Sequence, residues 1–133
     1  MVRASVIADE HQRLRLRLLA MAQPLAATVD VAVPFEPARG ALLRFLLDEL
    51  APNLADDEDL LLEASTREET RLLVAAIRGQ RRAIVAAITD LGDAQTAWEA
   101  VAVTRALHSL VAVHHMQEEE LLLPALAGVR STA

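Results

Sequence analysis

The chain has 133 residues, a formal net charge of −6, no cysteine and only 2% aromatic residues. This length fits one domain, residues 1–133, that buries its own hydrophobic core. The lack of cysteine excludes disulfides and thiolate metal sites, and the acidic charge argues against binding to nucleic-acid phosphates. No apolar run is long enough to span a bilayer and no signal peptide is recognisable, so we expect a cytoplasmic protein without a membrane partner.

The first predicted helix covers residues 5–22. Its apolar residues alternate between spacings of four and three, which is typical of a helix that faces a bundle core. This core stripe consists of Ile7, His11, Leu14, Leu18 and Met21. His11 is therefore predicted to point into the core. Pro24 is expected to end the pattern, because proline has no backbone N–H to donate.

The second predicted helix covers residues 37–64. Its core stripe is apolar except for Asn53 and Asp57, which lie one turn apart. Pro52 is expected to kink this helix just before Asn53. The kink and the polar pair coincide, which marks this level of the helix as unusual.

The third predicted helix covers residues 66–91. Ser65 and Thr66 precede two glutamates at the spacing of overlapping capping boxes, which favours a helix start here. Gln80 is the one strongly polar residue in its core stripe.

The fourth predicted helix covers residues 93–128, with Asp93 as its expected N-cap. Its core stripe contains His114 and Glu118 and is expected to continue through Leu121 and Ala125. His115 falls beside this stripe, and a surface position is predicted for it.

An internal repeat relates the second and fourth helices at an offset of 61 residues. Residues 53–64 match residues 114–125, with Glu58 on Glu119, three leucines on three leucines, and Asp57 on Glu118 in charge. A weaker alignment places His11 on Gln80. Together these patterns predict an all-α, antiparallel up-down-up-down four-helix bundle built from two similar helix pairs.

Each predicted helix thus contributes a polar residue to the core at one level. Burying ionised carboxylates among alanine and leucine costs several kcal/mol each unless they are paired or bound to a cation. The pattern therefore indicates a metal site or a closed hydrogen-bonded network.

Three stretches, residues 10–14, 52–62 and 114–124, resemble the hemerythrin-like (HHE cation-binding) domain family. The resemblance covers nearly the whole chain and implies a four-helix bundle that holds iron between its helices. It also implies that His11, His114 and Glu118 are metal ligands and that Asp57 is a bridging carboxylate. Glu58, Glu119 and His115 are the alternatives if the helix phase differs by one residue.

Two positions depart from that family's pattern, because Asn53 and Gln80 stand where it has histidines. Amide oxygens bind ferrous iron less well than imidazole does, so a di-iron centre is not expected, and a single metal or no metal is left open. The predicted ligands of a single metal are His11, Asp57, His114 and Glu118. Asn53 and Gln80 are predicted as cofactor-binding residues that orient ligands or water.

The resemblance implies iron binding, or sensing of redox state or of a diatomic gas such as oxygen or nitric oxide, with no turnover enzyme. The alternative is a metal-free helical interaction module that kept the fold and lost the site. A third hypothesis is a pocket for a small organic molecule. The sequence leaves open whether the chain forms a homodimer or binds another protein.

Overall fold

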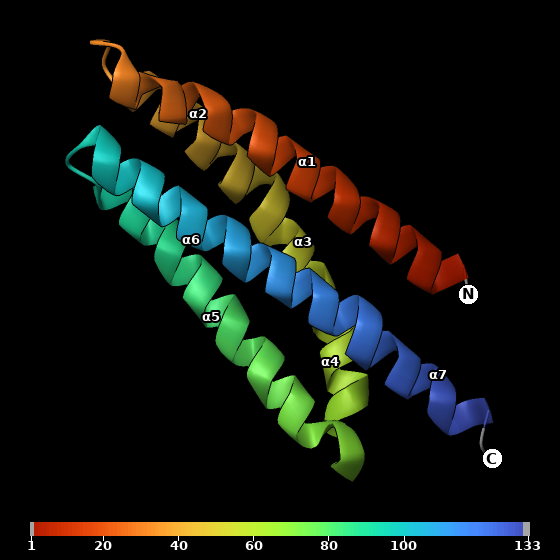
Figure 1. Ribbon diagram of the computed structural model, residues 1–133. Helices are drawn as coiled ribbons and strands as arrows, with labels where there is room; N and C mark the ends of the chain where they lie inside the picture. The colour runs from red at the N-terminus through yellow and green to blue at the C-terminus, as the bar shows by residue number, and fades with distance from the viewer. Residues whose placement is uncertain (1, 132–133) are drawn as a thin grey trace.

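The computed structural model describes the backbone of residues 2–131 and the side chains of residues 3–128. Within these residues the secondary structure is helical throughout and forms four long segments packed as a bundle (Figure 1). The first segment is α1 (Val2–Asp30), and the second runs through α2 (Glu36–Phe45), η1 (Leu46–Leu50), α3 (Ala51–Asp56) and α4 (Glu58–Ser65). After η2 (Glu68–Thr70), the third is α5 (Arg71–Asp93), and the fourth runs through α6 (Ala97–Met116), η3 (Gln117–Leu122) and α7 (Leu123–Ser131). The all-α prediction is confirmed.

The four segments surround one long core. α6 packs against both α1 and α5, and α2 packs against the same two helices from the other side. Figure 1 shows the chain turning back after α1, after α4 and after α5, so neighbours along the chain are also neighbours in space. Every segment therefore passes the middle of the bundle, where side chains from all four can meet.

The prediction that the first helix ends before Pro24 is wrong, because α1 continues to Asp30. Pro24 removes one backbone hydrogen bond, but it lies on the exposed face of the helix. The next residue, Leu25, is fully buried in the core. Burial of a leucine contributes about 1.5–3 kcal/mol, which offsets much of the proline's cost and favours the packed last turns of α1.

The predicted starts of the last two helices are also wrong. The hydroxyl groups of Ser65 and Thr66 donate to carbonyl groups three residues back in α4, so neither residue caps the next helix. α5 instead begins at Arg71, after the 3₁₀ turn η2 (a helical turn with i→i+3 hydrogen bonds). α6 begins at Ala97, where the Thr96 side chain accepts a hydrogen bond of 3.1 Å from the Glu99 N–H.

The buried apolar residues form two clusters along the bundle axis. The larger cluster includes Leu14, Leu54, Ile84 and Val111, one from each helical segment. The smaller cluster includes Leu61, Ile77 and Leu122 and packs against Ile7. In each segment the polar core residue, such as His11 in α1, lies in sequence between its contributions to the two clusters. A polar layer therefore divides the apolar core.

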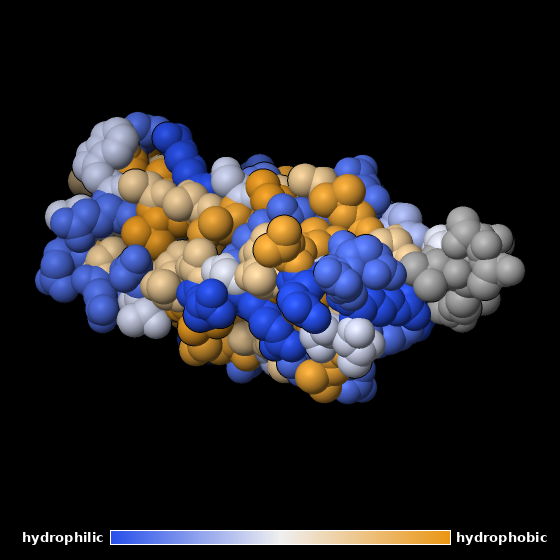
Figure 2. Space-filling view, turned by 90° about the horizontal axis from the view of Figure 1, so that it is seen from below, coloured by the Kyte–Doolittle hydropathy of each residue, from blue (hydrophilic) through white to orange (hydrophobic). Residues whose placement is uncertain are grey.

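The surface mixes apolar and charged side chains. Figure 2 shows separate apolar patches among hydrophilic residues on one face of the bundle. Leu72 and Trp98 are the most exposed large apolar residues among the described side chains, at 86% and 69%. None of the described helices is both long and apolar enough to cross a lipid bilayer.

Candidate metal centre

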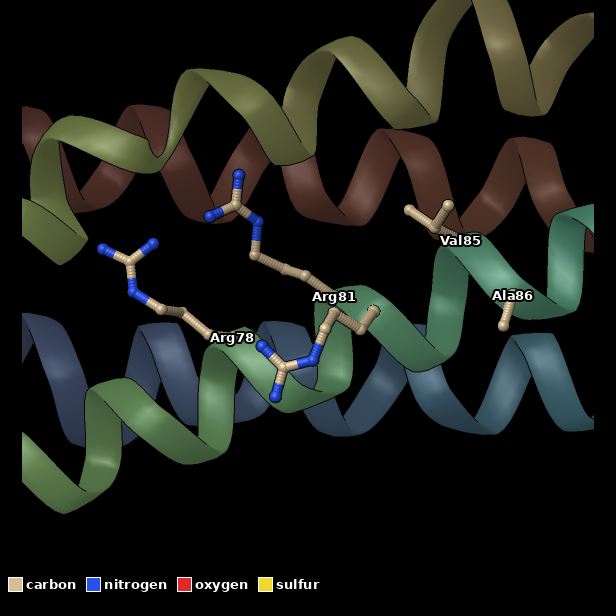
Figure 3. A pocket seen from close by; sticks show the side chains of 5 residues that line it. Arg78, Arg81, Val85 and Ala86 are labelled. Atoms are coloured by element: carbon tan, nitrogen blue, oxygen red, sulfur yellow. The ribbon is translucent and has the colours of Figure 1, made fainter.

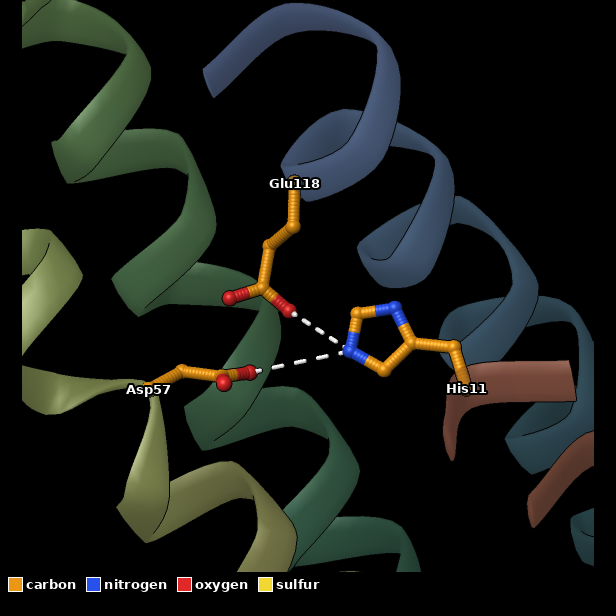
Figure 4. A group of neighbouring side chains, drawn as sticks. All are labelled: His11, Asp57 and Glu118. Atoms are coloured by element: carbon orange, nitrogen blue, oxygen red, sulfur yellow. Dashed lines mark ion pairs between the residues drawn. The ribbon is translucent and has the colours of Figure 1, made fainter. Parts of the chain in front are cut away.

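His11 on α1 is the centre of the polar layer and is fully buried. Its Nε2 lies 3.5 Å from Oε1 of Glu118 and 3.8 Å from Oδ2 of Asp57 (Figure 4). Its Nδ1 lies 2.8 Å from Oε2 of Glu119. If Nδ1–H donates to Glu119, the lone pair of the neutral ring is on Nε2 and faces the two carboxylates. This is the tautomer that a metal ligand needs.

Asp57 enters the core because the second segment is interrupted at this residue. α3 ends at Asp56 and α4 begins at Glu58, while Asp57 between them has φ −82° and ψ −1°. The ψ value is far from the −42° typical of an α-helix. A π-helical turn, η1, directly precedes α3, and Pro52 lies in the first turn of α3, so the predicted kink just before Asn53 stays a prediction. The regular α-helix is thus interrupted on both sides of Asn53, by η1 before it and at Asp57 after it.

Glu118 enters the core from a π-helical turn. In η3 the N–H of Leu123 donates to the carbonyl of Glu118, five residues earlier, so the turn holds one residue more than an α-helical turn. This extra residue shifts the helix phase beyond Glu118. Leu121, predicted in the core, is 47% exposed, while Leu122 is fully buried.

His114 lies one turn before Glu118 on the same helix and is fully buried. Its Nε2 is 3.2 Å from Oε1 of Glu118, the oxygen that also faces His11. Desolvation by burial lowers the pKa of His114 to about 4, so its ring is neutral and has a lone pair to offer. The four predicted metal ligands therefore meet in one buried group, of which His11, Asp57 and Glu118 have ligand atoms within 4.8 Å of one another.

The charge state of this group depends on burial. Desolvation raises the pKa of Glu118 to about 9, and the neighbouring carboxylate of Asp57 adds to the shift. Burial alone would lower the pKa of His11, but the nearby carboxylates of Asp57 and Glu118 and the hydrogen bond with Glu119 outweigh this effect and the pKa is raised. Without a cation, the layer therefore holds protons to limit its negative charge.

His115 is fully buried, so its predicted surface position is wrong. Its ring stacks on that of His11, with centroids 3.8 Å apart and an angle of 4° between the planes. Its Nδ1 lies 2.9 Å from NH1 of Arg15. A guanidinium group only donates, so Nδ1 accepts and the ring proton is on Nε2. His115 then has no free lone pair for a metal, and sequence periodicity did not reveal that Arg15 would cover it.

The two alternative glutamates are also held outside the centre. Glu58 accepts hydrogen bonds from Arg78 at 2.8 Å and Arg81 at 2.5 Å. Glu119 accepts from His11, and Arg15 lies 3.6 Å away. Both glutamates thus contact residues around the layer, and each follows directly after a carboxylate that is inside it.

Asn53 and Gln80 border the layer and are half-buried. The side-chain N–H of Gln80 donates to Oε1 of Gln117 at 2.7 Å. The carbonyl oxygens of both predicted residues are buried without a hydrogen-bond partner among the described residues. Both amide oxygens are thus free to act as ligands, and the predicted role of the two residues in orienting ligands or water stays a prediction.

Buried polar atoms without a hydrogen-bond partner among the described residues concentrate in this layer. Apart from NH1 of Arg67, they are His11 Nε2, Asn53 Oδ1, Asp57 Oδ2, Gln80 Oε1, both ring nitrogens of His114, His115 Nε2 and both carboxylate oxygens of Glu118. Each such atom costs about 1–3 kcal/mol in a protein interior, and more when charged. A cation could be bound by several of the lone pairs at once, and the imidazole and carboxylate donors suit a divalent transition metal.

Comparison with known proteins found no matching family model, no matching curated protein and no matching solved structure. The interpretation of the centre therefore depends on the geometry of its own residues. That geometry supplies a buried group of one imidazole and two carboxylates, His11, Asp57 and Glu118, that could hold a metal ion, with the ring of His114 3.2 Å from Glu118.

Proposed function

We propose that this protein is a hemerythrin-like, up-down-up-down bundle that binds one divalent metal ion, with ferrous iron as the expected ion. The ligands would be Nε2 of His11, the carboxylates of Asp57 and Glu118, and His114. The observation that carries the proposal is the convergence of buried lone pairs on one point without hydrogen-bond partners among the described residues. A bound cation offsets the cost of burying them.

One ion is proposed because the layer is unequal. His11 and His114 lie beside Glu118, whereas the side of the layer that carries Asp57 adds only the amide oxygens of Asn53 and Gln80 to that carboxylate. Amides are weaker ligands for iron than imidazoles, so a second ion would be held far less tightly.

The proposed role is binding or sensing of oxygen, nitric oxide or redox state, with no turnover chemistry. Ferrous iron would supply a coordination position for a diatomic ligand. The chain's own residues would exclude bulk water from it, since His11, His114 and Glu118 are fully buried. A change in ligand charge at this level would act on all four helical segments, because each contributes a polar residue to the layer.

The test is metal stoichiometry on untagged protein loaded anaerobically with ferrous iron, followed by exposure to nitric oxide. We expect about one iron per chain and a change in the visible spectrum when the gas is added. Glu118→Gln keeps the size of the side chain but removes its charge and should weaken binding at least about 100-fold. Glu120→Gln, an exposed change of the same kind two residues away, is the matched control.

The metal-free interaction module is the second candidate, because the high pKa of Glu118 offers another way to reduce the buried charge. In that case a proton on Glu118 replaces the cation. Protein that binds no stoichiometric iron, and whose thermal unfolding is unchanged by chelators and by added iron, would establish this candidate and exclude the first.

A further inference from the structure

The interruption at Asp57 leaves the end of one helix to be joined to the start of the next. The last carbonyl groups of α3, Leu54 among them, lie in a final helical turn, where partners from a following turn are lost. Such a junction is able to flex unless another part of the molecule spans it. Asp57, whose carboxylate faces His11, is the residue at the junction.

Arg81 on α5 spans this junction. Its NH2 donates to the backbone carbonyl of Leu54 at 2.8 Å, and its NH1 donates to Oε2 of Glu58 at 2.5 Å. One guanidinium group therefore contacts the last turn of α3 and the first residue of α4, on either side of Asp57. The side chain is only 18% exposed, and Figure 3 shows it reaching from α5 towards that segment.

We infer that Arg81 is a positioning residue that clamps the α3–α4 junction and thereby fixes the carboxylate of Asp57 in the metal centre. The second part rests on the proposed function. A planar guanidinium with diverging N–H donors is suited to hold two acceptors in fixed positions, which a lysine ammonium group on a flexible stem does less well. Partners behind the direct ligands commonly set ligand orientation in metal sites.

A neighbouring arginine, Arg78, makes it possible to distinguish this role from an effect of surface charge. Arg78 and Arg82 line the same open groove on α5, which has a volume of about 470 Å³ (Figure 3). Arg78 bonds to Glu58 at 2.8 Å, and no hydrogen bond joins it to α3 among the described residues. Arg78 is therefore a matched control with the same charge and one shared partner.

Charge and geometry predict opposite results when Arg81 is changed. A positive charge near the centre repels a cation, so its removal would tighten metal binding if charge alone mattered. Loss of the clamp frees the Asp57 carboxylate and weakens binding. Arg81→Lys keeps the charge and removes the two-point contact, so it isolates the geometric effect, while Arg81→Met removes both.

The first measurement uses metal-free protein in chelator and records amide hydrogen exchange at Leu61, whose N–H donates to the carbonyl of Asp57 at 3.2 Å. Arg81→Lys should raise exchange there at least about tenfold, and Arg78→Lys should change it less than threefold. Equal exchange in both variants would overturn the clamp, whether or not the protein binds metal.

The second measurement titrates Co²⁺ into the same proteins and follows affinity and the visible ligand-field spectrum. Arg81→Lys and Arg81→Met should each bind about tenfold or more weakly with an altered spectrum, and Arg78→Lys should match the wild type. Tighter binding by Arg81→Met, or unchanged affinity in Arg81→Lys, would overturn the positioning role. Wild-type protein that binds no Co²⁺ would instead refute the proposed function and with it the link to metal, while the exchange result would still decide the clamp.

Discussion

The two sides of the polar layer bring a carboxylate into the core by distorting a helix at matching points of the internal repeat. On the side of the layer that carries His114, called the histidine side below, Glu118 lies in the π-helical turn η3. On the side that carries Asn53 and Gln80, called the amide side below, Asp57 lies at the break between α3 and α4. Asp57 aligns with Glu118 at the offset of 61. Both distortions break the regular hydrogen-bonding pattern of the helix at the residue that must turn inward.

The glutamate after each carboxylate is also treated alike on the two sides. Glu119 bonds to His11 and lies beside Arg15, both from α1, and Glu58 bonds to Arg78 and Arg81 from α5. The two sides differ in the potential metal ligand one turn before the carboxylate, which is the imidazole of His114 on one side and the amide of Asn53 on the other. Both sides thus have a distorted helix, a buried carboxylate and an outer ion pair, and imidazole ligands are present on one side only.

The largest effect is expected when the two amide residues are replaced by histidines. Asn53→His together with Gln80→His should raise the stoichiometry from about one to about two ferrous ions per chain, with the second ion bound at least about 100-fold more tightly than before. The physical reason is that buried amide oxygens at these positions would be replaced by better ligands. Elemental analysis after anaerobic loading measures the result.

A surface histidine provides the control for that experiment. Gln95→His adds an imidazole at an exposed position between α5 and α6 and should leave the stoichiometry unchanged. A double variant that folds, as judged by its thermal unfolding, yet still binds one ion would show that the amide side lacks room or geometry for a second ion.

The next largest effect concerns pH, because the strongly perturbed groups lie on the histidine side. In metal-free protein, His114 and His115 have pKa values lowered by burial to about 4 and about 2, against an ordinary 6.5. The unfolded chain therefore binds more protons than the folded one below pH 6.5, and stability falls as the pH drops. Glu118, raised to about 9, acts in the opposite direction between pH 4.5 and 9, and the raised pKa of His11 adds to its effect above 6.5.

These signs place maximum stability near pH 6.5, with a decrease on both sides. Near pH 5 two histidines oppose one glutamate, so the unfolded chain binds about one proton more than the folded chain, and this difference falls to zero near pH 6.5. His114→Asn copies the amide side and should flatten this acid slope while the alkaline decrease remains. Urea unfolding in chelator from pH 5 to 9 measures both, and an unchanged acid slope in the variant would contradict the assignment.

The sequence predicted which residues reach the layer because periodicity alone places His11, Asp57, His114 and Glu118 on core stripes. It did not predict the π-helical turn η3, because a single inserted residue leaves the apolar pattern of a leucine run unchanged. Leu121, Leu122 and Leu123 are consecutive leucines, so nothing in their order shows which ones are buried.

The remaining differences arise from packing between distant segments. His115 is buried because Arg15 and the ring of His11, both on α1, cover it, and one helix's periodicity cannot register a neighbour's side chain. Pro24 was expected to end α1 from local propensity, but burial of Leu25 outweighs that preference. Predicting which residues are buried in the layer from sequence thus succeeded where helix position decided it, and failed where tertiary contacts did.

The smallest predicted effect tests the outer contact on the histidine side. Glu119 accepts from Nδ1 of His11 at 2.8 Å, which keeps the Nε2 lone pair turned towards the centre. Glu119→Gln still offers an oxygen to Nδ1–H but loses the negative charge that makes the imidazole a better ligand. We expect metal affinity to fall roughly threefold to tenfold, measured by competition with a chelator of known affinity. Glu120→Gln removes the same charge from the exposed side of the same turn and should lie within twofold of the wild type, so equal losses in both variants would mean that net charge alone, and not the contact with His11, tunes the centre.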